Sequence, residues 1–294
     1  MRLLGFEPGA PLIGALALTP LVAATAWLPL LLALALRSWV LAVVAALVAV
    51  MLAAAVLPRA LGGPQAPLAG GRTLSVMTAN LRYGHADPDA VMRLVRRHDV
   101  DLLSLQELTP MAARRLDRAG ARARFRYRVL EPRSGASGSG LLSRLPLRDA
   151  ARPPGTPHAM PQAQLAGPGV GPVLVKAVHT IPPLGGDVPV WREELRLLPH
   201  ATPTGQIRLL IGDFNATLDH HELRALIATG YRDAADTAGI GLDGTYRVRP
   251  RLPIRIAIDH VLVDQRGRVT DASVEPIPGS DHRALLVTLS LPAS

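Results

Sequence analysis

The chain of 294 residues contains no cysteine. Disulfide bonds and thiolate metal sites are therefore excluded, and the redox compartment of the protein stays undetermined. Phe, Trp and Tyr together make up only 3% of the chain. Arginine and aromatic residues come closest together in the segment from Arg122 to Arg128, which alternates like a strand with one solvated face. A protein that stacks nucleic-acid bases on aromatic rings is therefore disfavoured.

Lysine is nearly absent as well. Lys176 is the only lysine, so arginine supplies almost all of the positive charge, and the formal net charge is +9. Without Arg2, Arg37 and Glu7, the rest of the chain holds 30 basic and 22 acidic residues, a difference of +8. Such a balance suits an anionic substrate or anionic lipid head groups. Because the preference for arginine is a compositional habit of the whole chain, we give the charge little weight.

Charge is also missing from the beginning of the chain, where Arg37 is the only charged residue between Ala10 and Leu57. The stretches Ala10–Leu36 and Trp39–Leu57 are each long enough to cross a hydrocarbon core, which needs about 20 residues. We predict two transmembrane helices, the first kinked by its prolines. A cleaved signal peptide fits poorly, because the apolar region is too long and no basic segment precedes it.

Composition divides the chain into three parts. Residues 1–58 form the expected membrane anchor, and residues 59–72, rich in Pro, Gly and Ala, form a linker. Residues 73–294 are an ordinary mixed sequence in which predicted strands and helices alternate irregularly, and some strands follow one another directly. That order predicts an α+β domain with mixed rather than purely parallel sheets.

Polar residues follow an apolar run at Gly212-Asp213-Phe214-Asn215, after Ile207 to Ile211. Asp213 and Asn215 stand two positions apart, so an extended tip would point both side chains to one side. A strand followed by a simple Asx turn would leave the same pattern. The shared-site interpretation gains support because polar residues stand near the ends of other predicted strands too: Asn80, Glu107, His179, Asp259, Asp281 and His282. We therefore predict one site at the strand ends.

The segments around these residues resemble the endonuclease/exonuclease/phosphatase superfamily, which has the deoxyribonuclease I-like fold. The matching segments occur in the family's order from residue 73 to the C-terminus: Thr78-Ala79-Asn80-Leu81, Gln106-Glu107, Gly140-Leu141-Leu142-Ser143, Val178-His179, Gly212-Asp213-Phe214-Asn215, Ile258-Asp259-His260-Val261 and Gly279-Ser280-Asp281-His282. The resemblance implies a four-layer α/β sandwich of two packed mixed sheets that cleaves a phosphoester. With its two helices, the chain is similar to bacterial membrane-anchored members, including those linked to teicoplanin resistance.

The resemblance also implies roles for the metal-binding residues. Glu107 would be the main metal ligand, with Asn80 beside it and Asp281 near the metal. Oxygen ligands suit a hard ion, Mg²⁺ first and Mn²⁺ next.

The remaining residues would be catalytic. His282 would move a proton to or from the attacking water, and Asp259 would hold its imidazole in one tautomer. Asp213 would orient or deprotonate the water or protonate the leaving oxygen, and these alternatives stay open. Asn215 and His179 would hold phosphate oxygens. His260, His220 and His221 are interpreted as structural or surface residues.

The expected activity is a membrane-anchored, Mg²⁺-dependent phosphoesterase whose partners are the lipid bilayer and a phosphorylated lipid or another phosphoester close to it. An extracytoplasmic nuclease acting on nucleic acid is the less favoured alternative, and a catalytically idle membrane module that binds phosphorylated ligands is another. Positive residues do not decide the orientation, since Arg37 opposes Arg59 and Arg72. Likeness to outward-facing relatives predicts a multi-pass cell-membrane protein with an extracytoplasmic domain.

Overall fold

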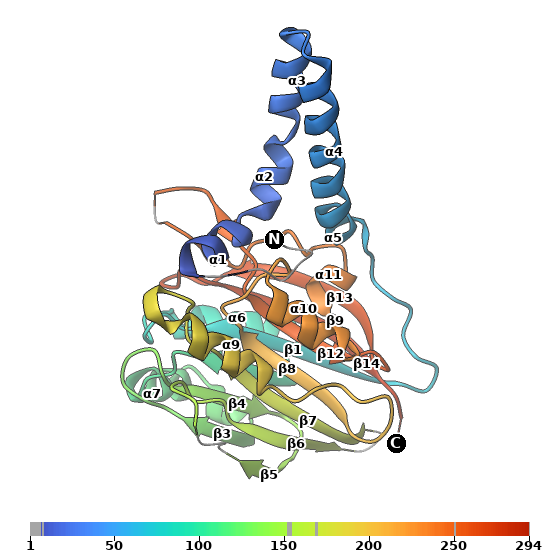
Figure 1. The fold of residues 1–294 in the computed structure, drawn as a ribbon. Coiled ribbons are helices and arrows are strands. Elements are labelled where there is room, and N and C mark those ends of the chain that lie inside the picture. Colours follow the sequence, from blue (N-terminus) through green and yellow to red (C-terminus); the bar gives the residue numbers. More distant parts are fainter. Residues whose placement is uncertain (1–6, 8, 152–154, 168–169, 250, 294) are drawn as a thin grey trace.

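The structure is a computed structural model that describes residues 7, 9–151, 155–167, 170–249 and 251–293. A globular part contains the strands, and a hairpin of helices projects from it (Figure 1). The chain's first described helix lies against the globular part at the base of this hairpin (Figure 1).

Two sheets of six strands form the centre of the globular part. The first has the order β13 (Arg268–Pro276), β14 (Arg283–Leu291), β1 (Arg72–Asn80), β2 (Leu102–Gln106), β4 (Ser139–Ser143) and β3 (Tyr127–Glu131). The second has the order β5 (Leu147–Ala151), β6 (Gln162–Gly167), β7 (Val170–His179), β8 (Ile207–Asp213), β12 (Asp259–Asp264) and β9 (Tyr231–Asp233). Strand β1 pairs with β2, and β7 with β8, in parallel, whereas the other pairs in both sheets are antiparallel. The prediction of mixed sheets is confirmed.

Alternating residues of the strands pack the two sheets face to face. Leu74 and Val76 of β1 lie in one cluster with Leu209 and Ile211 of β8, all of them buried. Side chains two positions apart share one face of a strand, so each sheet turns one apolar row inward. The intervening residues, such as Met77 on the first sheet, face an outer layer of helices. Each sheet is therefore buried on both faces.

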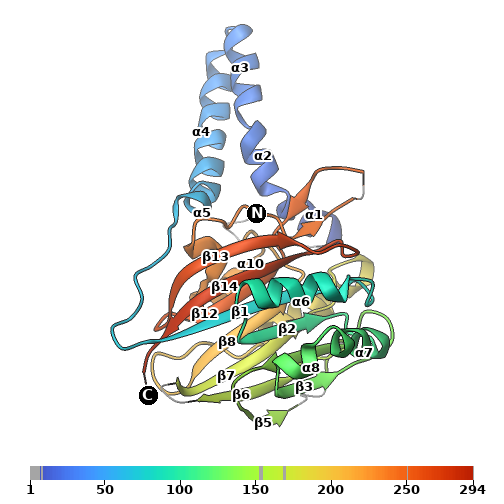
Figure 2. The ribbon, with the colours of Figure 1, turned by 180° about the vertical axis from the view of Figure 1, so that it is seen from behind.

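Helices cover the outside of both sheets. The first sheet packs against α6 (Pro88–Arg97), α7 (Pro110–Arg118) and α8 (Ala121–Arg124), as Figure 2 shows, and the second against α9 (Val188–Arg196) and α10 (His221–Ala228), as Figure 1 shows. Local signals begin these helices: the Asp87 carboxylate accepts a hydrogen bond from Asp89 N (2.9 Å), and Pro88 follows this cap. The four-layer sandwich predicted from the sequence is confirmed.

Buried polar contacts fix the two sheets to each other near the ends of their strands. Ser104 Oγ of β2 donates a hydrogen bond to Ile211 O of β8 (2.9 Å), and Gln106 Nε2 donates to Ser104 Oγ (2.9 Å). Gly212 has a φ of 154°, and a Cβ there would lie 1.9 Å from Val178 O. Only glycine fits at this position, because the backbone of β7 and the side chain of Gln106 approach it closely. The polar tip of β8 therefore lies beside the end of β2.

The first apolar stretch differs from its prediction. Instead of one span from Ala10 to Leu36, it forms α1 (Ala10–Ala17), α2 (Thr19–Thr25) and α3 (Trp27–Ala35). Pro20 begins α2, and the axis bends by 56° between α1 and the helices that follow. Among the described residues, α4 (Trp39–Val56) is the helix that is long and apolar enough by itself to cross a membrane, and the bent pair would be a second.

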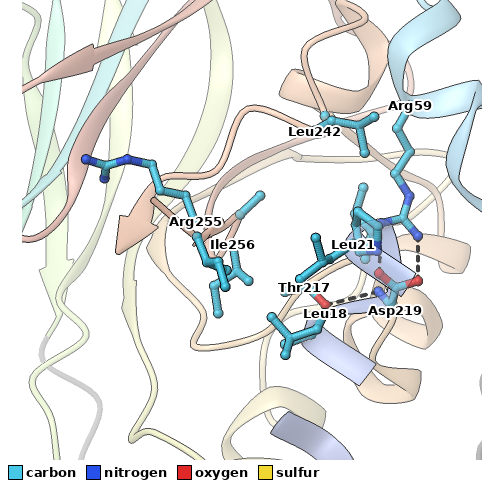
Figure 3. A pocket seen from close by; sticks show the side chains of 14 residues that line it. Leu18, Leu21, Arg59, Thr217, Asp219, Leu242, Arg255 and Ile256 are labelled. Carbon is cyan, nitrogen blue, oxygen red and sulfur yellow. Dashed lines mark hydrogen bonds and ion pairs between the residues drawn. The ribbon is translucent and has the colours of Figure 1, made fainter. Parts of the chain in front are cut away.

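The segment expected to be a linker begins with a fixed contact. Arg59, in the short helix α5 (Pro58–Leu61), donates two hydrogen bonds to the Asp219 carboxylate, at 2.8 and 2.6 Å. Figure 3 shows this pair, joined by dashed lines, at the side of a small pocket. Both side chains are buried. The end of the hairpin is thus held on the globular part by a bidentate ion pair.

Two local sequence interpretations are corrected. The segment around Arg122 is the helical turn α8 rather than strand, and the strand that follows begins at Tyr127. Phe125, between them, is completely buried under the first sheet, so it is unavailable for stacking on bases. Strands β5 and β6 were not predicted, because Pro-rich sequence between them hides their alternation.

Candidate active site

The predicted site residues meet at one edge of the two sheets. Strand ends deliver them, and the register brings the ends together: Asn80 pairs with Gln106 next to Glu107, and Asp213 pairs with both His179 and Asp259. His282 immediately precedes β14, the neighbour of β1. Residues separated by more than 200 positions in the chain therefore share one small region.

Asn80 bridges the two sheets at this edge. Its Nδ2 donates hydrogen bonds to Asp213 Oδ2 (3.1 Å) and to Glu107 Oε1 (3.2 Å). Its Oδ1 accepts from the backbone N–H of Arg82 (2.9 Å), which fixes the orientation of the amide. Asn80 is completely buried. In this arrangement it aligns the two carboxylates and turns its oxygen towards the backbone.

Glu107 reaches the site from a strained backbone. Its φ is 54°, a region that non-glycine residues rarely occupy; this conformation costs about 1–3 kcal/mol and persists only where surrounding contacts hold it. The N–H of Tyr83 donates to Glu107 Oε2 (2.6 Å). Burial raises the pKa of the Glu107 carboxyl, although the hydrogen bonds from Tyr83 and Asn80 oppose this rise. Both oxygens are thus presented at a fixed position between strand ends.

His282 lies between two carboxylates. Its Nδ1 donates a hydrogen bond to Asp259 Oδ2 (2.8 Å), and its Nε2 lies 3.8 Å from Asp213 Oδ2. The Asp259 contact fixes the ring and makes Nδ1 the protonated nitrogen, so Nε2 faces Asp213. This is the arrangement expected of a histidine that exchanges a proton on its Asp213 side.

Burial and charge shift the pKa values of this cluster in opposite ways. Burial raises the pKa of Asp213 to about 7, and the nearby Asp259 carboxylate adds to the rise. For His282, burial alone would lower the pKa, but the hydrogen-bonded Asp259 and the neighbouring Asp213 raise it to about 9. At neutral pH the imidazole of His282 is therefore a cation held beside the Asp259 and Asp213 carboxyl groups.

Asn215 stands beyond the tip of β8 with a φ of 47°. Its backbone N–H donates to Asp213 Oδ1 (2.9 Å), and its Nδ2 donates to Thr180 O (2.8 Å). The Asx turn considered from the sequence is therefore present, but it serves the shared site. Nδ2 carries two hydrogens and Thr180 O takes one of them, so the second N–H of Asn215 is left to donate to a phosphate oxygen.

His179 is buried and pairs with a histidine that the sequence analysis did not select. The rings of His179 and His158 lie 4.2 Å apart, centroid to centroid. Burial lowers the pKa of His179 well below its ordinary value, with His158 and His282 adding to the effect. Among the described residues, none hydrogen-bonds His179 Nδ1. A neutral imidazole at this place can bind a phosphate oxygen only as a hydrogen-bond donor.

Asp281 and Tyr246 close the outer side of the site. The Asp281 carboxylate is partly exposed and lies 3.7 Å from Arg82 Nε. The Tyr246 ring lies 4.8 Å from that of His282, centroid to centroid. Burial raises the pKa of the Tyr246 hydroxyl, and Asp281, Asp213 and Glu107 raise it further, so all three acids act on one point. Tyr246 was missed because it falls in a segment that reads as loop.

Two groups of acids in this region could hold a divalent cation. One ligand atom from each of Asp213, Asp259 and His282 lies within 4.8 Å of the others, and Asp259 Oδ1 is buried with no hydrogen-bond partner among the described residues. His282, however, would have to lose its proton to bind a metal. Glu107 and Asp281 offer oxygen atoms without that cost, and they act on each other electrostatically. The donor set at the site fits a hard divalent ion.

Two further histidines hold the fold. His260 donates to Asp233 Oδ2 (2.7 Å) from Nδ1 and to Ala216 O (2.8 Å) from Nε2. His220 donates from Nε2 to Ile13 O (2.9 Å) and accepts from Thr217 N (2.8 Å). The structural interpretation of these two residues agrees with their contacts, and His220 also attaches α1 to the domain.

Solved structures with the same fold include an endonuclease/exonuclease/phosphatase from Beutenbergia cavernae, with 20% identity, a TM-score of 0.54 and coverage of 75% of this chain and 72% of that one. An AP endonuclease from Archaeoglobus fulgidus is 15% identical over 73% of this chain and 98% of its own, with a TM-score of 0.56. The D. rerio TDP2 complexed with single strand DNA product is 16% identical over 74% and 98%, with a TM-score of 0.57. No protein of curated function matches.

Identity this low establishes the fold alone, so family membership depends on the sequence. The family described as "Endonuclease/Exonuclease/phosphatase family" matches residues 77–282, which include every predicted site residue from Asn80 to His282. Members of this family are divalent-metal-dependent hydrolases of phosphoester bonds. The chain belongs to the endonuclease/exonuclease/phosphatase family.

Proposed function

We propose that this protein is a membrane-anchored, Mg²⁺-dependent phosphoesterase that hydrolyses a phosphate ester or pyrophosphate of a lipid-linked or membrane-proximal substrate. The observation that carries the proposal is the convergence of Glu107, Asp213 and the hydrogen-bonded pair His282–Asp259 at one edge of the sheets. These groups supply the oxygen ligands and the proton exchange that phosphoester hydrolysis needs.

The chain's own residues divide the work of hydrolysis. Asp259 holds His282 through Nδ1, so that Nε2 is directed at Asp213. A phosphate bound between Asn215 and His179 would place its ester oxygen beside this pair. One member of the pair then accepts the proton of the attacking water, and the other supplies the proton to the leaving oxygen. Because acids surround this place, a phosphate dianion binds here only if positive charge offsets them.

A divalent cation meets that need. Glu107 and Asp281 would hold it, with Asn80 keeping the Glu107 carboxylate in place. When bound, Mg²⁺, or Mn²⁺ in its place, polarises a phosphoryl oxygen and neutralises the negative charge that develops on it. Removal of the cation with EDTA is therefore expected to abolish turnover.

The attachment of the domain to the hairpin supports a substrate at the bilayer. The ion pair of Arg59 with Asp219 and the contacts of α1 leave little free length between the last apolar helix and the domain. A site held this close to the membrane meets lipid head groups at high effective concentration. We place the domain on the extracytoplasmic face of the cell membrane, in keeping with the outward-facing relatives that the sequence resembles.

The test is phosphate release by the purified full chain, with Mg²⁺ or with EDTA, from a polyprenyl pyrophosphate and from a plasmid in parallel. We expect Mg²⁺-dependent release from the lipid, and its loss in Glu107→Gln and Asp213→Asn. The matched control is Asp271→Asn, which changes an exposed acid in the first half of β13. Full activity in both site variants would show that this edge of the sheets is not the catalytic centre.

A nuclease is the second candidate, because the structures of similar fold include an AP endonuclease and a TDP2 complexed with single strand DNA product. Nicking of the plasmid without release from the lipid would favour it. In that case DNA binding should weaken steeply with salt concentration.

A further inference from the structure

An apolar cavity adjoins the catalytic residues. It has a volume of about 300 Å³, and Asn215 and Tyr246 stand at one of its walls. This size is at the lower end of the range of about 300–1,000 Å³ found for small-molecule pockets. Apart from these two residues and His220, the cavity is lined by apolar side chains and glycine. Phosphate chemistry does not require such a surface, so the cavity serves a different part of the ligand.

The opposite wall of the cavity comes from the apolar N-terminus. Ile13, Gly14 and Ala17 of α1 line it. Ile13 is itself buried against the second sheet's helices, and His220 Nε2 donates to its carbonyl oxygen (2.9 Å). Glu7, which precedes α1, accepts a hydrogen bond from the His221 N–H (2.7 Å). The sequence directly before the membrane helices is therefore built into the catalytic domain.

The cavity continues towards the hairpin. A second, smaller space of about 50 Å³ shares Ala17, Leu18 and Ile256 with the first, and also reaches Pro20 and Leu21 of α2. Figure 3 shows Leu18 and Leu21 at this space, near Ile256 and beside the Arg59–Asp219 pair. Apolar residues of α1 and α2 thus line the way from the catalytic residues to the first turn of α2, where Arg59, Asp219 and Arg255 also line the second space.

The third wall is an amphipathic strand pair, β10 (Tyr246–Arg247) with β11 (Arg255–Ile256). Tyr246 and Val248 line the cavity, whereas the alternate residues Arg247 and Arg249 are exposed. Burial lowers the pKa of Arg255, and the nearby Arg283 and Arg247 lower it further, so these cations are crowded together. The strand pair offers an apolar face to the cavity and a cationic face to anionic groups outside it.

We propose that this cavity, the α1 cavity, binds the first part of the hydrocarbon chain of a lipid-linked phosphate, whose phosphate lies at Asn215 and whose remaining chain continues along α1 and α2 into the bilayer. The inference rests on the proposed phosphoesterase activity and specifies its substrate class. Three observations favour a lipid chain: the apolar lining of the cavity, its contact with the catalytic residues at one end, and its continuation along apolar residues of α1 and α2 at the other.

Gly14 provides a direct test. A Cβ at this position meets no atom within 4 Å, so a larger side chain can enter the cavity without disturbing its walls. We expect Gly14→Leu to lower the ratio of kcat/KM for a polyprenyl pyrophosphate to that for dimethylallyl pyrophosphate by about tenfold, because the long substrate depends on apolar burial. Gly63→Leu, which adds the same group in open space outside the cavity, should leave the ratio unchanged. Full-length protein in nanodiscs is used throughout.

Other outcomes separate the two proposals. A wild type that hydrolyses the pyrophosphates, with the same ratio in Gly14→Leu, would overturn the cavity and leave the phosphoesterase standing. If Gly14→Leu does not fold, Val248→Trp fills the cavity from the side of β10 and should lower the same ratio. A wild type inactive on both pyrophosphates would overturn the proposed function. Photo-crosslinking of Glu107→Gln by a diazirine-bearing prenyl phosphate then decides the cavity: labelling of α1 or β10 supports it, and labelling elsewhere overturns it.

Discussion

At the scale of single residues, the site depends on the hydrogen bond between Asp259 and His282. The carboxylate accepts a hydrogen bond from Nδ1 at 2.8 Å, and the pair is buried. Without that partner, burial would favour the neutral imidazole, and the ring would lose the hydrogen bond that fixes its orientation. Asp259 therefore favours the charged form of His282 and fixes which ring nitrogen faces Asp213.

Asp259→Asn should therefore lower kcat by about 100- to 10,000-fold, the usual contribution of positioned proton transfer. The KM should change little, because Asp259 is a positioning residue with no expected substrate contact. The kcat–pH profile should also shift, since the pKa of His282 falls once the negative charge is gone. Steady-state kinetics from pH 5 to 10 would show both effects. A large KM change with an unaltered pH profile would mean that Asp259 contacts the substrate instead.

The buried carboxyl of Glu194 leads to a prediction about how stability depends on pH. Burial raises the pKa of this α9 carboxyl to about 7, although its Oε2 accepts a hydrogen bond from Ile181 N (2.7 Å). The pKa of Glu194 in the folded state lies above the ordinary 4.5. The contribution of the protonated carboxyl to the free energy of unfolding is therefore fully present below pH 4.5, and it is lost as the pH rises through 7 and the buried group ionises. The shift corresponds to about 3 kcal/mol.

Glu194→Gln should remove this pH dependence. Compared with the wild type, the variant should gain about 3 kcal/mol of unfolding free energy between pH 4.5 and pH 8. Urea unfolding of the full chain in detergent at several pH values measures the difference. Glu193→Gln, the exposed neighbour on the same helix, is the control and should follow the wild type. Parallel curves for wild type and Glu194→Gln would contradict the raised pKa.

At the scale of elements, the hairpin and the domain are joined at two places. The helix before the hairpin, α1, packs into the core beside α9 and α10, and the helix after it, α5, contributes Arg59 to the ion pair with Asp219. Hydropathy could not reveal the first contact. An apolar helix packed on a protein and one surrounded by lipid have the same composition. In the structure, a 56° bend before Thr19 marks where α1 ends and the hairpin begins.

Arg59→Ala should destabilise the protein by about 3–5 kcal/mol, because it removes the cation beside a fully buried carboxylate. The double variant Arg59→Leu with Asp219→Leu should recover most of this loss, since no charge then stays buried. Thermal unfolding in detergent gives the comparison. Arg93→Ala, in an exposed pair with Asp87, should change the stability by less than about 1 kcal/mol. Equal effects of Arg59→Ala and Arg93→Ala would show that the ion pair contributes no more than a surface contact.

At the scale of the whole molecule, the sandwich and the meeting of the candidate site residues at strand ends could be predicted from the sequence for identifiable reasons. Asp213 and Glu107 follow apolar strands directly, which marks them as strand-end residues. His158 and Tyr246 escaped detection, because each lies in a segment without periodic pattern and enters the site only through the fold. The α1 cavity was equally hidden, since its walls come from residues more than 200 positions apart.

The topology of the whole chain also predicts where each part lies relative to the membrane. The contacts of α1 and α5 keep both ends of the hairpin at the domain, so on the proposed membrane anchoring we expect the turn at Arg37 on the opposite side of the bilayer. The chain has no cysteine, which makes single-cysteine labelling unambiguous. On intact cells, a membrane-impermeant maleimide should label Gly186→Cys, in an exposed loop of the domain, and spare Arg37→Cys until lysis. The reverse pattern would place the domain in the cytoplasm, and labelling of both before lysis would show that the hairpin does not cross the membrane.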